Sequence, residues 1–198
     1  MRIIAGSAKG RRLGTVKGRD IRPTADRVKE SLFNVLGARV AGAAFLDLFA
    51  GSGNVGLEAL SRGARLCVFV ELMTPHLKVV AENLRTTGLL ERAELLRRDA
   101  RGAAADLGNR GRRFDLIFID PPYGQDLIPP ILAEVAAHQL LTDVGWVIAE
   151  HHKKDPLPDA VPGPAVAGGL ARFRELVFGE TILSLYRPAT IPSGRQSV

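Results

Sequence analysis

The segment Phe45-Leu46-Asp47-Leu48-Phe49-Ala50-Gly51-Ser52-Gly53-Asn54-Val55-Gly56 decides the fold of this 198-residue chain. An apolar run passes here through a glycine-rich turn into a stretch with helical spacing of apolar residues. The turn contains the pattern Gly-x-Gly-x-x-Gly, and Glu71 follows at the end of the next apolar run. In an open α/β sheet this arrangement places a nucleotide-like ligand at the carboxyl ends of the strands, where the acidic residue accepts hydrogen bonds from ribose hydroxyls.

Around this segment, short apolar runs alternate with helical segments. The runs that predict strands are 44–49, 66–70, 93–96, 115–119 and 144–149, and the helical segments are 55–61, 76–84 and 127–138. This alternation predicts an α/β fold with a mostly parallel sheet and helices on both faces. Residues 172–178 and 181–186 alternate with period two, which is typical of a C-terminal antiparallel hairpin at the sheet edge. The Pro- and Gly-rich stretch 155–169 is predicted to be a surface loop.

Composition excludes several classes of protein. With 46% hydrophobic and 24% charged residues, the chain resembles an ordinary globular protein of one domain plus a short extension. The single cysteine, Cys67, rules out an internal disulfide, and the four histidines show no metal-ligand spacing, so no metal site is predicted. His151 and His152 follow a predicted strand, and their role stays open. No apolar run approaches the ~20 residues of a membrane-spanning helix, and no secretory signal is evident, so we expect a cytoplasmic monomer.

The net charge of +6 lies entirely near the N-terminus. Residues 1–30 hold nine basic and three acidic side chains, whereas the other 168 residues hold 18 of each sign. Such a segment favours contact with nucleic-acid phosphates, although a merely solvated terminus is the alternative. Residues 2–16 predict a small glycine-rich hairpin, and a helix is predicted from Thr24, a plausible N-cap, to a stop at Gly37.

Asp47 favours one class of ligand for the glycine turn. A carboxylate at the end of the first strand would repel the pyrophosphate of a dinucleotide, but it suits S-adenosylmethionine, which carries an ammonium and a sulfonium centre. Asp99 follows the third predicted strand, where it could accept a hydrogen bond from an adenine amino group or serve as a helix N-cap. A glycine turn that serves only tight packing is the remaining alternative.

Asp120-Pro121-Pro122-Tyr123 follows the fourth predicted strand. The two prolines fix the backbone, so the Asp120 carboxylate is held rigidly at the strand end. Methylation of an exocyclic base amine needs such an acceptor, because the amine lone pair is delocalised into the ring and the amine must be held in line with the methyl donor. Tyr123 would stack on the extruded base. The alternative is a proline-braced turn with a capping Asp.

Four motifs together resemble a known family. They are Arg2-Ile3-Ile4-Ala5-Gly6 with Lys9-Gly10-Arg11-Arg12-Leu13, the run RPTADRVKESLFN at 22–34, DLFAGSGNVGLEALSRGA at 47–64 and DPPY at 120–123. The combination is similar to the bacterial 16S ribosomal RNA (guanine(966)-N2)-methyltransferase family over residues 2–187. The last two motifs occur in many amino-methyltransferases, so the N-terminal pair carries the specificity.

The resemblance implies a class I methyltransferase fold with a seven-stranded sheet and an N-terminal extension. We therefore expect a basic RNA-facing extension (1–38) and an S-adenosylmethionine-dependent domain (39–188). The tail (189–198) is predicted from its own sequence to be disordered. The implied donor-binding residues are Asp47, Phe49, Gly51, Gly53, Glu71, Asp99 and Ala100, and the implied catalytic residues are Asp120, Pro121, Pro122 and Tyr123. The implied RNA contacts are Lys9, Arg11, Arg12, Arg22, Arg27 and Lys29. Asn54 and Met73 depart from the family pattern, which leaves their effect on donor binding open.

The implied function is methyl transfer to the N2 of a guanine in 16S rRNA, within an assembled or assembling small ribosomal subunit. A DNA adenine-N6 methyltransferase is the nearest alternative, because DPPY suits that amine equally well. A dinucleotide-dependent oxidoreductase would explain the glycine turn, but it would leave DPPY and the basic segment unexplained. A non-enzymatic RNA-binding protein with a relic donor pocket is the third alternative.

Overall fold

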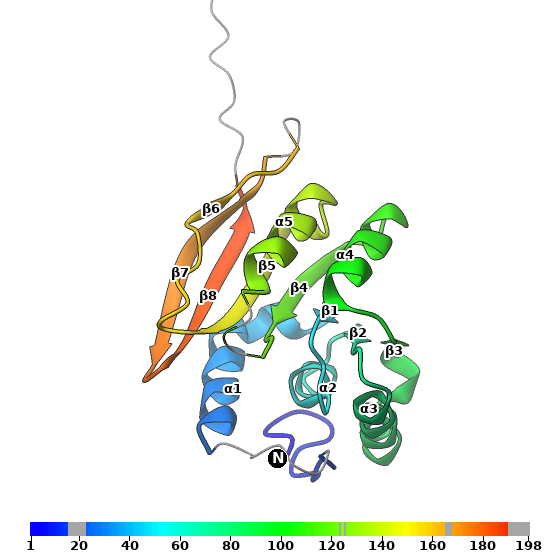
Figure 1. The fold of residues 1–198 in the computed structure, drawn as a ribbon. Coiled ribbons are helices and arrows are strands. Elements are labelled where there is room, and N and C mark those ends of the chain that lie inside the picture. Colours follow the sequence, from blue (N-terminus) through cyan, green and yellow to red (C-terminus); the bar gives the residue numbers. More distant parts are fainter. Residues whose placement is uncertain (16–22, 123, 125, 165–167, 190–198) are drawn as a thin grey trace, which may run out of the picture.

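The computed structural model describes residues 1–15, 23–122, 124, 126–164 and 168–189. These residues form one eight-stranded sheet with helices on both faces, in the strand order β3-β2-β1-β4-β5-β8-β7-β6 (Figure 1). The strands are β1 (Ala44–Asp47), β2 (Leu66–Val70), β3 (Ala93–Leu96), β4 (Phe114–Ile119), β5 (Leu141–His152), β6 (Ala160–Val161), β7 (Leu170–Phe178) and β8 (Thr181–Pro188). The helices are α1 (Pro23–Leu36), α2 (Asn54–Ser61), α3 (Thr74–Thr87), α4 (Ala100–Asn109) and α5 (Ile128–Ala137), with short 3-10 turns η1 (Gly37–Val40) and η2 (Leu90–Arg92).

The parallel part of the sheet reverses its order at β1. This strand pairs in parallel with β2 on one side and with β4 on the other, and β5 then continues in parallel beside β4. The crevice at such a reversal is where open α/β sheets bind ligands, at the carboxyl ends of the strands. The β7–β8 hairpin joins β5 in antiparallel, as the period-two alternation predicted.

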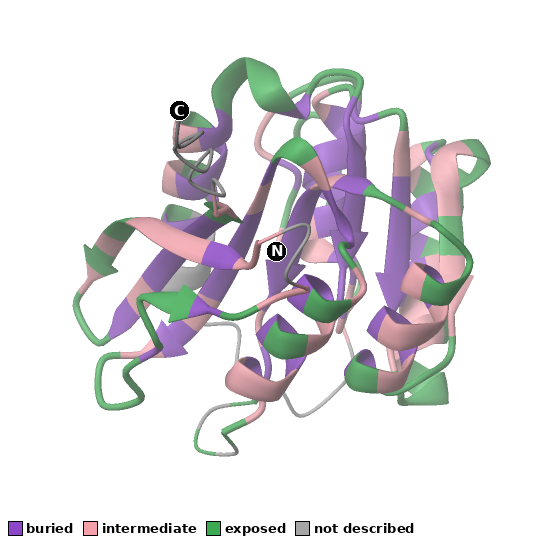
Figure 2. Cartoon of the chain, turned by 90° about the horizontal axis from the view of Figure 1, so that it is seen from above, coloured by how far each residue is buried: buried purple, intermediate pink, exposed green. Residues whose placement is uncertain are grey.

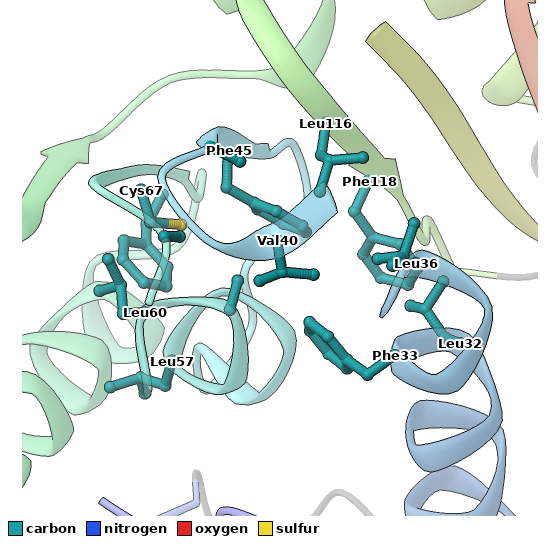
Figure 3. Packing of buried hydrophobic residues seen from close by; sticks show 14 of the residues in the cluster. Leu32, Phe33, Leu36, Val40, Phe45, Leu57, Leu60, Cys67, Leu116 and Phe118 are labelled. Atoms are coloured by element: carbon teal, nitrogen blue, oxygen red, sulfur yellow. The ribbon is translucent and has the colours of Figure 1, made fainter. Parts of the chain in front are cut away.

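Two hydrophobic clusters hold the layers together, and neighbouring residues on a strand serve opposite clusters. Phe45 on β1 packs into the cluster that contains residues from α1, α2 and α3, whereas Leu46 packs into the cluster from α4 and α5. Figure 3 shows Phe33 of α1 and Val40 of η1 facing the sheet side chains Phe45 and Phe118. The central strands β1 and β4 are consequently almost entirely buried, whereas β3 and β7 are partly exposed (Figure 2). No helix in the described part of the chain is long and apolar enough to cross a membrane.

The stretch predicted as a surface loop, 155–169, is partly wrong, because it contains β6. This two-residue strand pairs with β7 and makes the sheet eight-stranded instead of seven-stranded. Leu157 and Val161 are buried in the α4–α5 cluster, and the hydroxyl of Tyr186 donates to the Pro158 carbonyl at 2.8 Å. These long-range contacts order a Pro- and Gly-rich stretch whose local pattern predicts only a loop.

The N-terminal segment folds back on itself and docks on α2. Arg2 and Arg12 form an antiparallel bridge, so the predicted hairpin is present in a minimal form. The amides of Ile4 and Ala5 both donate to the buried carboxylate of Glu58 on α2, at 2.7 and 3.0 Å. Apolar side chains from this segment belong to the α1–α3 cluster. The boundary predicted at residue 38 stays a prediction, since segments on both sides share one core. Apart from Ala189, the tail predicted to be disordered lies outside the described residues.

Gly6 marks the closest approach of the N-terminal segment to α2. Its φ is +83°, and an added Cβ would lie 1.8 Å from the Ser61 carbonyl oxygen. Gly10 has a similar φ of +81°, but nothing lies within 4 Å of its added Cβ. We expect Gly6→Ala to lower the free energy of unfolding by about 3 kcal/mol. Gly10→Ala, the matched control, should lower it by only about 1 kcal/mol, because it suffers the backbone strain alone. Urea unfolding of both variants measures the difference, and equal values would mean that the docking seen at Gly6 is loose.

Candidate active site

Two carboxylates meet at the point where the sheet reverses its order. Asp47 is the last residue of β1, and Asp120 directly follows β4. The register pairs Asp47 with Phe118, so both carboxylates stand at the same edge of adjacent parallel strands. Glu71 follows β2 at this edge as well. The structure thus brings together three acidic residues that the sequence places in separate motifs.

The glycine turn is fixed to the end of β2 by Glu71. The Gly51 amide donates to Glu71 Oε2 at 2.9 Å, and the Met73 amide donates to Oε1 at 2.8 Å. The ring of His76 approaches the same carboxylate, with Nδ1 3.4 Å from Oε2. These contacts orient the Glu71 side chain, and Oε1, which among them accepts only from the Met73 amide, retains a second lone pair with which it can accept from a ligand.

Asp47 is a buried carboxylate with an unsatisfied atom. It is 2% exposed, its Oδ2 accepts from the Gly56 amide at 3.3 Å, and its Oδ1 is buried without a hydrogen-bond partner among the described residues. Burial first, and then the negative charges of Asp120 and Glu71, raise the pKa of Asp47 from 3.8 to about 7, although the nearby backbone amides of Gly56 and Phe49 act to lower it. An unsatisfied buried acceptor of this kind is typical of a site that awaits a donor group from a ligand.

A pocket of about 530 Å³ opens at this edge of the sheet. The predicted site residues that line it are Phe49, Glu71, Asp99, Ala100, Asp120 and Pro122. The pocket combines these polar groups with apolar walls from several elements, as small-molecule sites do. Asp47, Gly51 and Gly53 are not among its lining residues, although Leu48 and Phe49, which follow Asp47 in the chain, are. We call this cavity the donor pocket.

Further residues of the donor pocket carried no signal in the sequence. The cavity is also lined by His76 on α3, Arg98 before α4, Arg101 on α4, and Leu127 and Ile131 at α5. Only the tertiary fold brings these residues there. Leu72 and Met73 are 61% and 53% exposed at the same pocket. Exposed apolar side chains at the rim of a pocket indicate a surface that a bound ligand covers. Met73, whose effect was open, therefore lies where it can contact a ligand directly.

Asp99 satisfies one of its two predicted roles. Its side chain caps α4 by accepting from the Gly102 amide at 2.8 Å, which confirms the N-cap alternative. The same carboxylate is exposed at the donor pocket, so the contact to an adenine amino group stays a prediction that the cap does not prevent. Ala100, the first residue of α4, is buried beneath it.

The Asp-Pro-Pro turn separates the donor pocket from a second cavity of about 310 Å³. Asp120 is half-buried on the donor side, whereas Pro121 lines only the second cavity. Pro122 and Leu127 line both, so the two cavities adjoin. Tyr123, the predicted stacking residue, lies outside the described residues.

Most of the described basic residues of the N-terminal segment are accessible. Lys9, Arg11, Arg12 and Arg27 are exposed, and Arg22 lies outside the described residues. The Gly14 amide donates to Asn83 Oδ1 at 2.7 Å, and Asn83 in turn donates to the carbonyl of Ser52 in the glycine turn at 2.9 Å. These two contacts connect the end of the segment to the glycine turn beside the donor pocket.

Lys29 departs from its predicted role as an RNA contact. It is 2% exposed, and its ammonium donates to the Arg2 carbonyl at 2.8 Å and to Asn54 Oδ1 at 2.7 Å, with Glu58 Oε2 3.4 Å away. The prediction that Lys29 contacts phosphates is wrong, because this buried ammonium joins α1, α2 and the N-terminal segment. The contact also gives Asn54, the other departure from the family pattern, a structural partner away from the donor pocket.

The family model described as "Conserved hypothetical protein 95" matches residues 1–187. The chain belongs to this family. It is 40% identical over 187 residues to "Putative rRNA methyltransferase YlbH" of Bacillus subtilis (strain 168), covering 94% of this chain and 98% of the relative. It is 33% identical over 189 residues to "Ribosomal RNA small subunit methyltransferase D" of Escherichia coli (strain K12), covering 94% and 89%. Among solved structures, "Putative methyltransferase yhhF from Escherichia coli" superposes with a TM-score of 0.80 at 31% identity, covering 96% of this chain and 99% of that one.

Membership of the Conserved hypothetical protein 95 family confirms three predictions: the family resemblance, the class I methyltransferase fold and the enzyme class. The methyltransferase relatives support the predicted methyl donor, S-adenosylmethionine. Two more distant methyltransferase structures share the fold at 14% and 16% identity. The orphaned Asp47 oxygen behind an acid-lined pocket fits a cofactor with a cationic donor group. The oxidoreductase alternative is set aside, since these relatives are methyltransferases. The individual site residues stay predictions.

His151, whose role the sequence left open, lies outside the donor pocket of this family member. It is 2% exposed, and its Nε2 is 2.9 Å from Ser184 Oγ on β8. Its Nδ1 is 3.2 Å from the His152 carbonyl, so both ring nitrogens already have partners within the sheet. His151 therefore braces the β5–β8 pair at the wall of the second cavity.

Proposed function

We propose that this chain transfers a methyl group from S-adenosylmethionine to the exocyclic N2 of a guanine in small-subunit ribosomal RNA. The observation that carries the proposal is the donor pocket itself, where Glu71 and Asp99 share one cavity with Asp120 at the reversal of the sheet. The names of the relatives support ribosomal RNA as the substrate class. The alternative of a non-enzymatic relic is disfavoured, because the pocket and Asp120 are both present.

The donor-side residues match the polar groups of the cofactor. S-adenosylmethionine supplies an electrophilic methyl group on a sulfonium centre. Asp47 would accept from its ammonium through the unsatisfied Oδ1, Glu71 from its ribose hydroxyls and Asp99 from its adenine amino group. Phe49, Leu72 and Met73 would cover the apolar parts of the ligand.

The acceptor-side residues hold a weak nucleophile. Asp120 would accept a hydrogen bond from an N–H of the guanine amine, which positions the nitrogen and favours localisation of its lone pair towards the methyl group. The adjoining prolines keep this carboxylate at the strand end, so little reorganisation is needed when the base arrives. The base itself must leave its stack to reach the pocket.

Methyl transfer from labelled S-adenosylmethionine tests the proposal directly. Unmethylated small ribosomal subunits, naked small-subunit RNA and duplex DNA are incubated in parallel with the enzyme, and the products are digested to nucleosides. We expect label in N2-methylguanosine, and the subunit-to-naked-RNA ratio reports whether an assembled particle is required. Label in N6-methyladenine of DNA instead would replace the proposed substrate with that of the DNA enzyme.

The exposed N-terminal arginines are expected to contact RNA phosphates. Arg11→Ala together with Arg12→Ala should weaken RNA binding and reduce the slope of log K against log salt by about 2, because about one counterion is released per phosphate contact. Arg110→Ala with Arg113→Ala is the matched control, because it removes the same charge from two exposed positions. Arg110 follows α4 and Arg113 precedes β4, so both lie at the ends of these elements that are remote from the donor pocket. An unchanged slope for the N-terminal pair would place the RNA surface elsewhere. Filter binding from 50 to 300 mM salt measures the slopes.

A further inference from the structure

The second cavity lies against the side of the Asp-Pro-Pro turn that faces away from the donor pocket. Its lining comes from the turn and the start of α5 on one side, and from the end of β5 and the residues after it on the other. The cavity adjoins the donor pocket at Pro122 and Leu127. A base whose amine reaches Asp120 at the donor pocket can therefore extend its ring into this second cavity.

Glu150 is placed beside Asp120 by the strand register. Ile119 on β4 pairs with Ala149 on β5, so the next residues along these parallel strands are Asp120, which follows β4, and Glu150, which lies within β5. Neighbouring strands lie about 4.8 Å apart. Asp120 lines the donor pocket and Glu150 lines the second cavity, and both are half-buried. The two carboxylates thus stand side by side across the boundary between the cavities.

Two adjacent carboxylates match only one of the bases that carry an exocyclic amine. Guanine presents two kinds of donor next to each other on its Watson–Crick edge, the N2 amine and the N1–H. Adenine and cytosine present a lone pair on the ring nitrogen beside the amine. A second carboxylate therefore accepts a hydrogen bond from guanine, whereas it faces a lone pair and is repelled in the other two bases.

We propose that Glu150 determines the specificity for guanine by accepting a hydrogen bond from N1–H while Asp120 accepts from the N2 amine. This inference rests on the proposed function and names the group that selects its base. The other acidic residues of the second cavity, Asp126 and Asp155, are both exposed, and neither belongs to a strand end beside Asp120. The buried His151 ring is engaged with Ser184 and the His152 carbonyl.

Replacing the target guanine with 2-aminopurine tests this role. The analogue keeps the N2 amine but carries a lone pair at N1, and it is introduced by ligation into small-subunit RNA that is then assembled into subunits. We expect wild-type kcat/KM to be at least about 100-fold lower on 2-aminopurine than on guanine. In Glu150→Gln, the side-chain amide can donate to the N1 lone pair, so this ratio should fall at least about tenfold.

The ratio of the two substrates separates the possible failures. It is measured on one enzyme sample at a time, so a general loss of folded protein cancels. Asp155→Asn, which removes a carboxylate from the same cavity, should keep the wild-type ratio. A Glu150→Gln ratio equal to that of wild type would overturn the role of Glu150, as would a wild-type enzyme that accepts both substrates equally. Absence of wild-type transfer to the guanine substrate would instead refute the proposed function.

Discussion

Asp120→Ala is expected to lower kcat for methyl transfer about 1000-fold, because it removes the acceptor that positions the guanine amine. Donor binding should survive, since the other donor-side groups remain. It should even strengthen slightly near pH 7, because the charge of Asp120 contributes to the raised pKa of Asp47 and its removal favours the ionised Asp47 carboxylate. Single-turnover transfer and calorimetric titration with S-adenosylmethionine measure the two effects separately.

The series at position 120 makes this prediction specific. Asp120→Asn keeps one oxygen acceptor without the charge, so its kcat should lie between those of the wild type and Asp120→Ala. Asp143→Ala removes an exposed carboxylate of β5 that lines neither cavity, so this control should retain the wild-type rate. A rate for Asp120→Ala within tenfold of wild type would show that the turn only braces the strand end.

The elements that locate the site could be predicted because their signals are local. The glycine turn, the acidic residue after β2 and the prolines after β4 each act within a few residues of a strand end. The parallel arrangement then brings their strand ends to one edge of the sheet. The motifs therefore located the donor pocket, although not its volume or its full lining.

Lys29 could not be predicted in the same way, because its environment is entirely long-range. On the helix it lies off the apolar stripe, like Arg27, and the sequence gives both the same solvent-facing interpretation. Lys29 differs from Arg27 in that it lies within ion-pair distance of Glu58 on α2. The Glu58 carboxylate also accepts hydrogen bonds from the amides of the N-terminal segment. Only the docking of three separate segments buries this lysine.

His76, Leu127 and Ile131 were missed for a related reason. Each belongs to a helix or loop whose own pattern indicates packing, and they line the donor pocket only because α3 and α5 flank the carboxyl edge of the sheet. The strand β6 was missed because two residues carry no periodicity, and β7 supplies its pairing. Tertiary contacts thus determine the walls of the site, while local motifs determine its acidic groups.

Asp47→Asn is expected to stabilise the ligand-free protein at pH 8. The folded pKa of Asp47 is raised from 3.8 to about 7, so the folded state binds a proton that the unfolded state releases between these values. The contribution of Asp47 to the free energy of unfolding should therefore be greatest below about pH 4 and should fall as pH rises towards 7. The total loss should be about 4 kcal/mol, because the pKa differs by about three units between the folded and unfolded states. The asparagine cannot ionise and removes this loss. Thermal unfolding at pH 5 and pH 8 measures it.

Asp99→Asn is the matched control for this stability effect. Asn is as good an N-cap as Asp and Asp99 is exposed, so Asp99→Asn should not reproduce the stabilisation that Asp47→Asn gives at pH 8. If the unfolding of the wild type and of Asp47→Asn changed equally between pH 5 and pH 8, burial would not hinder the ionisation of Asp47 in the folded state.

Asp47→Asn should also weaken binding of the methyl donor. This effect would link the unfavourable buried charge of Asp47 to function. The ammonium of S-adenosylmethionine would pair with ionised Asp47, so wild-type affinity should rise between pH 5 and pH 8 as the carboxyl loses its proton. In Asp47→Asn, affinity should be lower, by about 10-fold to 100-fold at pH 8, and should lose this rise. Calorimetric titration at both pH values tests the coupling. A variant that is more stable and yet binds the donor as well as wild type would separate Asp47 from the donor, and would leave its burial without a functional reason.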